Sequence, residues 1–552
     1  MLATVCNAIA RCREAAWFEV VFLRTEELKK INGQLSRLFC HIVLSFFSQD
    51  GHNFASAGIH LTLHDGTSLR IFMNYGMSLA DEAALHSAYQ CKGASGLKPC
   101  AICANIFNWS NVRDVVANDA SGISRYHTCC EIRDIVLHTP ATLHTTVQRL
   151  AAAAAAGMSA AKLAELETRL GWNLVARGIM QDDYLRPLVE PTQHMLYDTM
   201  HVYFVNGIFN VHVGRLMESL KPYSITYQTL ERYVCRWNWP ARIKGNAGSD
   251  ALAGKRAKSS SSDGVFKCTA AEALSLVPVM AQFVKAAVLT SNSDEAKRHG
   301  ACFMLLSKVL DLVEASARGN TTPQELQRAI VAHLRTFKAL YGDAYMPIKF
   351  HLSIHFPMFL ERWGLLPNCF VLERKHRTPK RFANEHRNTS SHWEASILRE
   401  CTTLHFAELD RRRCKRRHFE AAACLVSPTT PSRRMMTLLS SELRAGPDDR
   451  ILASRKARVN EWETCSQNDV VRVSGSPDFV GKIKFFASLS VNGQDHVFAG
   501  ILRWAPLAEG HRCTKWRAVD DNLTLVMADE ILCSLIWSES GGISTVLAPS
   551  FL

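Results

Sequence analysis

The first 75 residues alternate between strand-like and helix-like patterns of apolar side chains. Residues 17–23 (WFEVVFL) form a short apolar run rich in β-branched residues, which predicts a strand. Apolar residues then recur at helical spacing over residues 25–47, which predicts a helix. Residues 59–63 and 69–75 flank Asp65-Gly66, a dipeptide that favours a tight turn, so we expect a β-hairpin there.

Helical patterns dominate the middle of the chain. Residues 142–170 predict one long helix, and Gly171 suits its C-cap. Residues 242–264 shift to Gly, Ala, Lys and Ser, which predicts a flexible basic surface loop, either solvated or touching DNA phosphates. Helices are expected again over residues 269–341, where Thr322-Pro323 marks the start of the last one.

Short strands replace helices near the C-terminus. Segments of apolar and β-branched residues separated by turn residues predict strands at 470–473, 480–486, 496–504, 523–527 and 531–536. Several short strands at this spacing predict a small β-barrel domain over residues 469–552, preceded by a linker over residues 426–468.

Composition narrows the class of protein. The chain has 552 residues, of which 47% are hydrophobic and 21% charged, so fibrous and wholly disordered classes are excluded and several domains are expected. The 18 cysteines are scattered mostly singly, which indicates free thiols in a reducing compartment. The most apolar stretch, residues 270–289, is interrupted by Glu272, Pro278 and Lys285, so no membrane partner is predicted.

Positive charge is concentrated in one segment. The chain carries 64 Lys plus Arg against 51 Asp plus Glu, a net charge of +13, which favours a polyanionic partner such as DNA. Residues 374–417 alone hold 13 basic and 5 acidic side chains. Residues 411–417, at the end of this segment, could be a nuclear localisation signal. The alternative for the whole segment is a solvated helix face. The predicted DNA contacts are Arg374, Lys375, Arg377, Lys380, Arg381, Arg411, Arg412, Arg413, Lys415, Arg416 and Arg417.

Two pairs of residues together form the ligand set of one zinc ion. Cys100 and Cys103 form a CxxC pair, and His351 and His355 have the i, i+4 spacing that places both imidazoles on one helical face. Each pair alone has a plain alternative: two buried thiols, or a coincidence in a chain with 22 histidines. Two Cys and two His close the coordination shell, so we expect a structural Zn²⁺ rather than the open site of a zinc hydrolase.

Two acids lie at similar chain distances outside these pairs. Asp81 precedes Cys100 by 19 residues, and Glu373 follows His355 by 18. If one zinc ion joins the two pairs, the carboxylates of Asp81 and Glu373 could together hold catalytic Mg²⁺ for phosphoryl transfer. The basic residues that follow Glu373 suit a phosphate backbone near such a site.

The order of these motifs resembles a known family. Residues 79–103 resemble the second-aspartate block of CACTA-type (CMC superfamily) DDE transposases, an acid followed by a helix, a small-residue turn and a CxxC. Tyr197-Asp198-Thr-Met-His201 resembles their D-x-x-H motif, and residues 349–375 resemble their histidine-pair and glutamate block. The same order recurs in the catalytic core of the V(D)J recombinase.

This resemblance implies a fold and an activity. It implies an α/β protein with an RNase H-like core interrupted by a long, mainly α-helical insertion: residues 1–130 as a partial catalytic core, 131–345 as the insertion and 346–425 as the end of the core. It implies Mg²⁺-dependent DNA strand cleavage and transfer in the nucleus, with DNA as the partner, either transposon ends or non-specific duplex. Pairing of the ends in the family makes a homodimer plausible. The implied catalytic residues are Asp81 and Glu373, with Asp198 and His201 either near the active site or packing a helix.

The chain departs from the family pattern at the first aspartate. Residues 17–47 resemble the third strand and first helix of the core, which would place the first two strands, and the first aspartate, upstream of Met1. Asp50 and Asp65 are the internal candidates, but a polar loop and an Asp-Gly turn explain them. We therefore expect an N-terminally truncated, catalytically impaired transposase, and the alternative is a non-catalytic nuclear DNA-binding protein derived from one.

Overall fold

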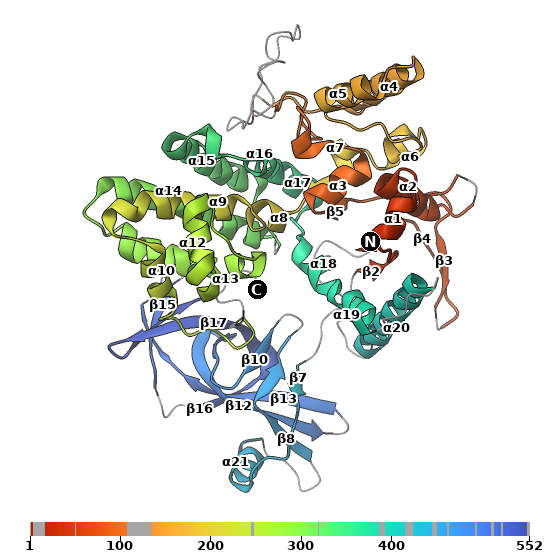
Figure 1. Ribbon diagram of the computed structural model, residues 1–552. Coiled ribbons are helices and arrows are strands. Elements are labelled where there is room, and N and C mark those ends of the chain that lie inside the picture. Colours follow the sequence, from red (N-terminus) through yellow and green to blue (C-terminus); the bar gives the residue numbers. More distant parts are fainter. Residues whose placement is uncertain are drawn as a thin grey trace. The chain divides into compact units, whose positions relative to one another are not determined.

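The chain folds into two compact units, each built from two separate stretches of sequence. Unit 1 comprises residues 1–208 and 315–407, and unit 2 comprises residues 209–314 and 408–552. Both mix helices with strands (Figure 1). The residues that this computed structural model describes are 2–3, 17–49, 51–63, 65–107, 132, 135–243, 245, 248–317, 319–385, 392–413, 423–443, 450–460, 463–491, 494–508, 513–519 and 523–548.

Two short parallel strands of unit 1 position Asp81 and Asp198. Strand β5 (Ser78–Ala80) pairs with β6 (Met195–Tyr197), with Ala80 opposite Tyr197. Each strand is followed at once by an aspartate and a helix: Asp81 caps α3 (Glu82–Tyr89), and Asp198 caps α8 (Thr199–Tyr203). Because the strands are parallel and in register, their carboxyl ends, and the aspartates on them, lie side by side.

The N-terminal part of unit 1 follows the predicted order of elements. The strand predicted over residues 17–23 is β2 (Phe18–Glu19), which pairs with β1 (Leu2–Ala3). The helix predicted over residues 25–47 is two helices, α1 (Thr25–Lys30) and α2 (Gln34–Phe46), because the left-handed Gly33 (φ 86°) separates them.

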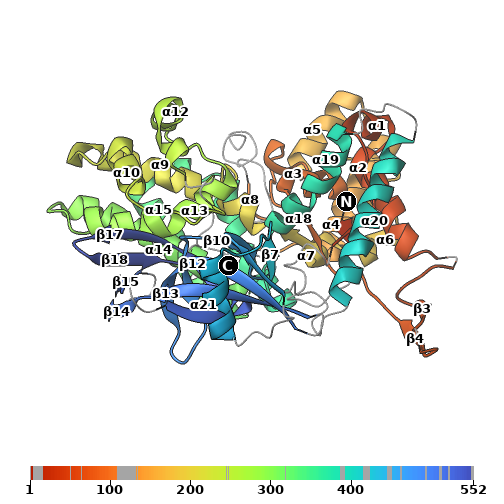
Figure 2. The same cartoon turned by 90° about the horizontal axis from the view of Figure 1, so that it is seen from below.

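The predicted hairpin is confirmed. Strands β3 (Ile59–Thr62) and β4 (Ser68–Ile71) pair antiparallel, and Asp65 Oδ1 accepts a hydrogen bond from the Thr67 N–H in the turn. The hairpin extends away from the helices that flank it in the chain (Figure 2).

The remaining helices of unit 1 match the predicted pattern except for one break. Residues 142–170 form α4 (Pro140–Ala155) and α5 (Ala160–Leu170) because Gly157 (φ 79°) interrupts the pattern, and Gly171 is the expected left-handed C-cap. Thr322 caps α15 (Pro323–Tyr341) as expected. The other helices are α6 (Leu185–Leu188), α7 (Pro191–His194), α16 (Ile348–Leu352), α17 (Phe356–Trp363), α18 (Cys369–Lys375), α19 (Arg377–Glu385) and α20 (Trp393–Arg413).

One prediction for unit 2 is wrong: residues 242–264 are not a flexible loop. They contain α11 (Ser249–Leu252) and α12 (Gly254–Asp263), held by two fully buried side chains of α11 and by a bidentate ion pair from Arg256 to Glu272. The serine-rich composition concealed these anchors. The other helices of unit 2 are α9 (Ile208–Leu220), α10 (Tyr227–Val234), α13 (Ala270–Phe283) and α14 (Asp294–Ser316).

Helix α13 continues through a π-helical turn, Val284–Val288, and this segment is the apolar stretch of the sequence. Among the described residues it is the one helix long and apolar enough to cross a membrane, and 67% of its 18-residue window is buried inside the protein. Pro278 does not break the helix, and Glu272 is paired within unit 2 with Arg256.

The C-terminal strands form a curled half-barrel, where the sequence predicted a small β-barrel. The nine-stranded sheet runs from β14 to β16, and these two end strands are not paired with each other in the described part of the chain. Its strands are β8 (Arg450–Ser454), β11 (Val470–Val473), β12 (Phe479–Val491), β13 (Gln494–Arg503), β14 (Ala505–Ala508), β15 (Cys513–Arg517), β16 (Leu523–Met527), β17 (Ile531–Ser540) and β18 (Ile543–Leu547).

This sheet begins before residue 469. Residues 426–468, expected as a linker, include β8, which pairs with β12 through five residues of register, from Ser454 opposite Phe486 to Arg450 opposite Ser490. They also include most of a three-stranded sheet and one helix, because their short apolar runs find partners far along the chain. These elements are β7 (Cys424–Val426), α21 (Arg433–Leu443), β9 (Lys456–Arg458) and β10 (Thr464–Ser466).

Candidate functional site

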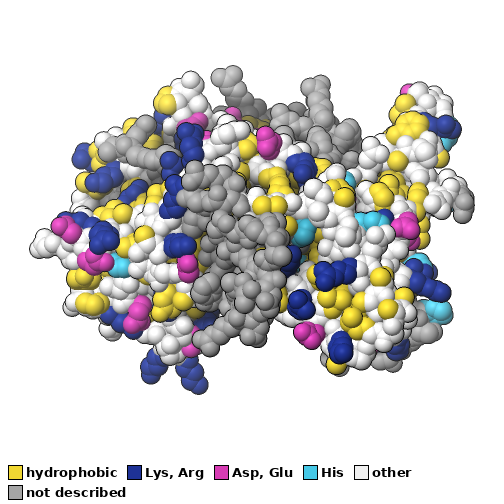
Figure 3. Space-filling model, turned by 90° about the horizontal axis from the view of Figure 1, so that it is seen from above, with side chains coloured by type: hydrophobic (Ala, Val, Ile, Leu, Met, Phe, Trp, Pro, Cys, Tyr) yellow, Lys and Arg dark blue, Asp and Glu magenta, His cyan; other side chains and the backbone are white. Residues whose placement is uncertain are grey.

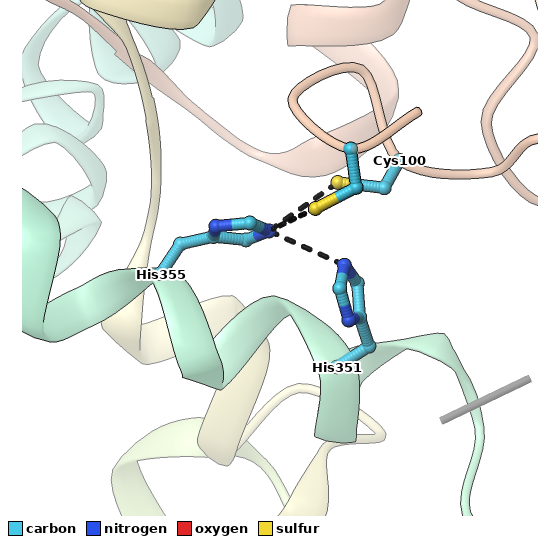
Figure 4. Close-up of side chains that lie close together, drawn as sticks. Cys100, His351 and His355 are labelled. Carbon is cyan, nitrogen blue, oxygen red and sulfur yellow. Dashed lines mark hydrogen bonds between the residues drawn. The ribbon is translucent and has the colours of Figure 1, made fainter. Parts of the chain in front are cut away.

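The predicted CxxC pair and histidine pair converge in unit 1. Cys100 and Cys103 lie in the loop after α3, whereas His351 lies in α16 and His355 in the 3-10 turn that follows it. All four side chains are buried, and their ligand atoms lie within 4.8 Å of one another. His355 points toward both the sulfur of Cys100 and the ring of His351 (Figure 4).

The separations between these donor atoms match a tetrahedral ion. His355 Nε2 lies 3.4 Å from each sulfur and 3.2 Å from His351 Nε2. Zn–S and Zn–N bonds of normal length give tetrahedral edges of about 3.5 Å for S···N and about 3.3 Å for N···N. The cluster can therefore hold a metal such as zinc.

The electrostatics of the cluster favour the protonation states that bind metal. Burial opposes ionisation of Cys100, but Cys103 and the two imidazoles outweigh it and hold the pKa of the Cys100 thiol well below its usual value. Burial lowers the pKa of His351, which keeps this imidazole neutral. A thiolate and a neutral imidazole are the forms that coordinate metal ions.

Tyr197 lies against this cluster and was missed in the sequence. Its hydroxyl accepts a hydrogen bond from the Ala101 N–H at 3.3 Å and lies 3.7 Å from Cys100 Sγ. The side chain is 1% exposed, and burial raises the pKa of Tyr197 well above its usual value, so the phenol keeps its proton. The signal available in the sequence was its place directly before Asp198 in the D-x-x-H-like motif.

Asp81 and Glu373 both line one cavity of about 600 Å³ in unit 1. Both carboxylates belong to exposed residues, and they are the acids among the described residues that line it. His201 and His376 also line the cavity, and its walls are otherwise mainly apolar. Carboxylate oxygens are among the ligands that hard divalent cations prefer.

Asp198 does not line this cavity but organises the helices around it. Its buried carboxylate accepts four hydrogen bonds: from the backbone N–H groups of Met200 (3.2 Å), His201 (2.9 Å) and Cys369 (2.7 Å), and from His201 Nδ1 (2.5 Å). Four bonds occupy the lone-pair sites of a carboxylate. Asp198 therefore ties α8 to the start of α18, the helix that carries Glu373.

His201 lines the cavity, and its pKa is raised. Burial would lower the pKa of His201, but the hydrogen bond and charge of Asp198, with the charge of Asp81, raise it above its usual value. Lys349 was not predicted from the sequence either. Its Nζ donates hydrogen bonds to the carbonyls of His201 (3.0 Å) and Val205 (2.5 Å). It fixes the C-terminal end of α8, and its place two residues before His351 was the available signal.

The predicted DNA contacts differ in how exposed they are. Arg377, Lys380 and Arg381 are exposed on α19, whose opposite face buries Phe382. Arg374 is half-buried on α18. Arg411, Arg412 and Arg413 end α20, and Lys415, Arg416 and Arg417 lie outside the described residues.

Lys375 departs from the prediction. Its side chain is only 13% exposed, and its Nζ lies 3.7 Å from Glu19 and 2.7 Å from His405 Nδ1. The charge of Lys375 is therefore engaged by side chains inside unit 1. On the face that Figure 3 shows, Lys and Arg side chains are dispersed among acidic and apolar ones. Among the predicted DNA contacts whose side chains the structure describes, the exposed ones are Arg377, Lys380 and Arg381, all on α19.

Comparison of the chain with protein-family models, with curated proteins and with solved structures finds no match in any of the three.

Proposed function

We propose that this chain is a transposon-derived DNA transposase of the DDE type, built on an RNase H-like core and acting on DNA in the nucleus. The observation that carries the proposal is that Asp81 and Glu373, far apart in sequence, line one cavity. Parallel strands that each end in an aspartate and a helix are consistent with this core.

Two metal ions belong to the proposal. The buried Cys100, Cys103, His351 and His355 would hold structural Zn²⁺, for which their donor spacings are suited. Asp81 and Glu373 would hold Mg²⁺, which when bound supplies charge stabilisation at the phosphoryl oxygens.

The chain's own residues would bind and orient the DNA. The imidazole of His201, held through Nδ1 by Asp198, lines the cavity and could donate a hydrogen bond to a phosphate oxygen. The exposed Arg377, Lys380 and Arg381 follow Glu373 in the chain and would hold the flanking backbone by charge.

We propose that strand cleavage is impaired, because the cavity offers two carboxylates where the family uses three. Asp198 has its lone pairs occupied by hydrogen bonds, Asp65 is engaged in the β3–β4 turn, and Asp50 lies outside the described residues. The same observation favours the second candidate, a non-catalytic nuclear DNA-binding protein derived from a transposase.

Nicking of supercoiled plasmid by the purified chain separates the two candidates. An impaired transposase nicks slowly with Mn²⁺ or Mg²⁺ and loses this activity in Asp81→Asn, a change that keeps the helix cap because Asn also accepts from the Ala84 N–H. Asp65→Asn, which alters an exposed turn acid in the same way, is the matched control.

Duplex binding without nicking would select the DNA-binding protein. Neither binding nor nicking would contradict both candidates.

A further inference from the structure

We propose that Tyr197 is a positioning residue that couples the metal centre to the carboxylate cavity, so that the loaded Cys/His cluster holds Asp81 and Glu373 in place. The proposal rests on the proposed function, whose carboxylate site it explains. Tyr197 is the last residue of β6, and Asp198 follows it directly. The side chain of Tyr197 contacts Cys100 of the Cys/His cluster, and the side chain of Asp198 contacts the N-terminus of α18.

The hydroxyl of Tyr197 has the geometry of a donor to a metal-bound thiolate. It accepts from the Ala101 N–H at 3.3 Å, which leaves its own proton for Cys100 Sγ at 3.7 Å. All three residues are at most 3% exposed, so water does not compete for these bonds. A hydrogen bond to a ligand orients the ligand and tunes its donation to the metal.

The backbone of β6 connects the contact between Tyr197 and Cys100 to the positions of Asp81 and Glu373. Ala80 lies opposite Tyr197 in the parallel pair, so the end of β6 sets the position of Asp198 beside Asp81. Asp198 in turn accepts from the N–H of Cys369 at 2.7 Å, at the first turn of α18, and Glu373 lies one helical turn further along. A shift of Tyr197 therefore displaces both carboxylates relative to each other.

The aromatic ring has a packing role that can be separated from this coupling. Its centroid lies 6.0 Å from that of His355 and 6.2 Å from that of Phe359. Tyr197→Phe keeps these ring contacts and removes only the hydroxyl. A residue needed for packing alone would tolerate this change without effect on either metal site.

The first test replaces zinc with Co²⁺ in the full chain and records the thiolate-to-cobalt charge-transfer band. In Tyr197→Phe we expect this band to shift and Co²⁺ affinity to fall about 10- to 100-fold, the usual effect of losing a partner of a metal ligand. The matched control is Tyr227→Phe, a buried tyrosine of unit 2 whose hydroxyl has no hydrogen-bond partner among the described groups. An unshifted band with unchanged Co²⁺ affinity would overturn the contact.

The second test titrates Mn²⁺ into the zinc-saturated chain and follows binding by electron paramagnetic resonance. We expect Tyr197→Phe to weaken Mn²⁺ binding about fivefold or more, the range of a modest coupling between sites. Equal Mn²⁺ affinity in Tyr197→Phe and the unaltered chain would overturn the positioning role. Asp81→Asn is measured alongside. If Asp81→Asn leaves Mn²⁺ binding unchanged, the carboxylate site of the proposed function is wrong. If Asp81→Asn weakens Mn²⁺ binding and Tyr197→Phe does not, only the coupling is wrong.

Discussion

At the scale of single residues, the sequence predicted the four members of the Cys/His cluster because their signal is local. A CxxC and a HxxxH each place two donors on one turn, and the structure brings Cys100, Cys103, His351 and His355 within ligand distance. The sequence could not predict which polar groups pair between distant parts of the chain. Lys375 turns inward because Glu19 and His405 lie beside it in the fold and not in the chain.

The ligand residues give the first prediction at this scale. Cys100→Ser and His355→Ala should each reduce bound zinc from about one equivalent to none, measured by atomic absorption of the purified chain. Loss of a buried metal site falls in the class of changes that cost more than about 4 kcal/mol, so the melting temperature of unit 1 should fall as well. Cys302→Ser, which alters a buried thiol outside the cluster, should keep its zinc. Full zinc occupancy in both ligand variants would refute the metal centre.

At the scale of secondary structure, predictions succeeded where a capping signal was present and failed where burial decided the outcome. Thr322 and Gly171 mark helix ends as expected, and Gly33 and Gly157 split two predicted helices because they adopt left-handed conformations. Strand β6 was not predicted, since three buried residues carry no periodicity that distinguishes a strand from a helix.

Helix α19 gives a prediction about DNA affinity. The combined variant Arg377→Ala, Lys380→Ala, Arg381→Ala should weaken duplex binding and reduce the slope of log K against log salt by about 0.9 for each phosphate that the protein no longer neutralises. Fluorescence anisotropy over a salt series measures both quantities. Removing three exposed charges elsewhere in unit 1, with Arg149→Ala, Lys162→Ala and Arg169→Ala on α4 and α5, should leave affinity and slope nearly unchanged. Equal losses in the two triple variants would mean that α19 is not the DNA-binding face.

The contact of α15 with α16 gives a prediction about acid stability. Burial lowers the pKa of His333 to about 3, and its ring stacks on Phe350 of α16 with 6.3 Å between centroids. Because the unfolded chain binds a proton near pH 6.5 and the folded chain does not, the stabilising contribution is present above pH 6.5 and is lost as the pH falls toward 3. This costs about 1.4 kcal/mol per pH unit, so about 2 kcal/mol at pH 5.

Urea unfolding at pH 7 and pH 5 measures this loss. His333→Gln should show a smaller difference between the two pH values than the unaltered chain, whereas His41→Gln, on the exposed side of α2, should show the same difference. A His333→Gln chain that loses as much stability as the unaltered protein would contradict the assignment.

At the scale of the whole molecule, the sequence predicted a mixed α/β protein with a β-rich C-terminus and could not predict how the stretches combine. The division into two units follows pairings between distant segments, such as residues 315–407 with residues 1–208. The extent of the C-terminal sheet also depended on such pairings, since β8 joins β12 across the expected linker. Local patterns carry no information on these contacts.

We propose that one cavity of unit 1 holds both a divalent cation and DNA, whether or not cleavage is efficient. Fe²⁺ bound at Asp81 and Glu373, with ascorbate and peroxide, generates hydroxyl radicals that cut only the nucleotides near it, so strand scission of an end-labelled duplex locates the cation on the bound DNA. We expect cuts confined to a few adjacent nucleotides on each strand, abolished by Asp81→Asn and retained in Asp65→Asn. Scission spread evenly along the duplex, or a localised pattern that persists in Asp81→Asn, would contradict it.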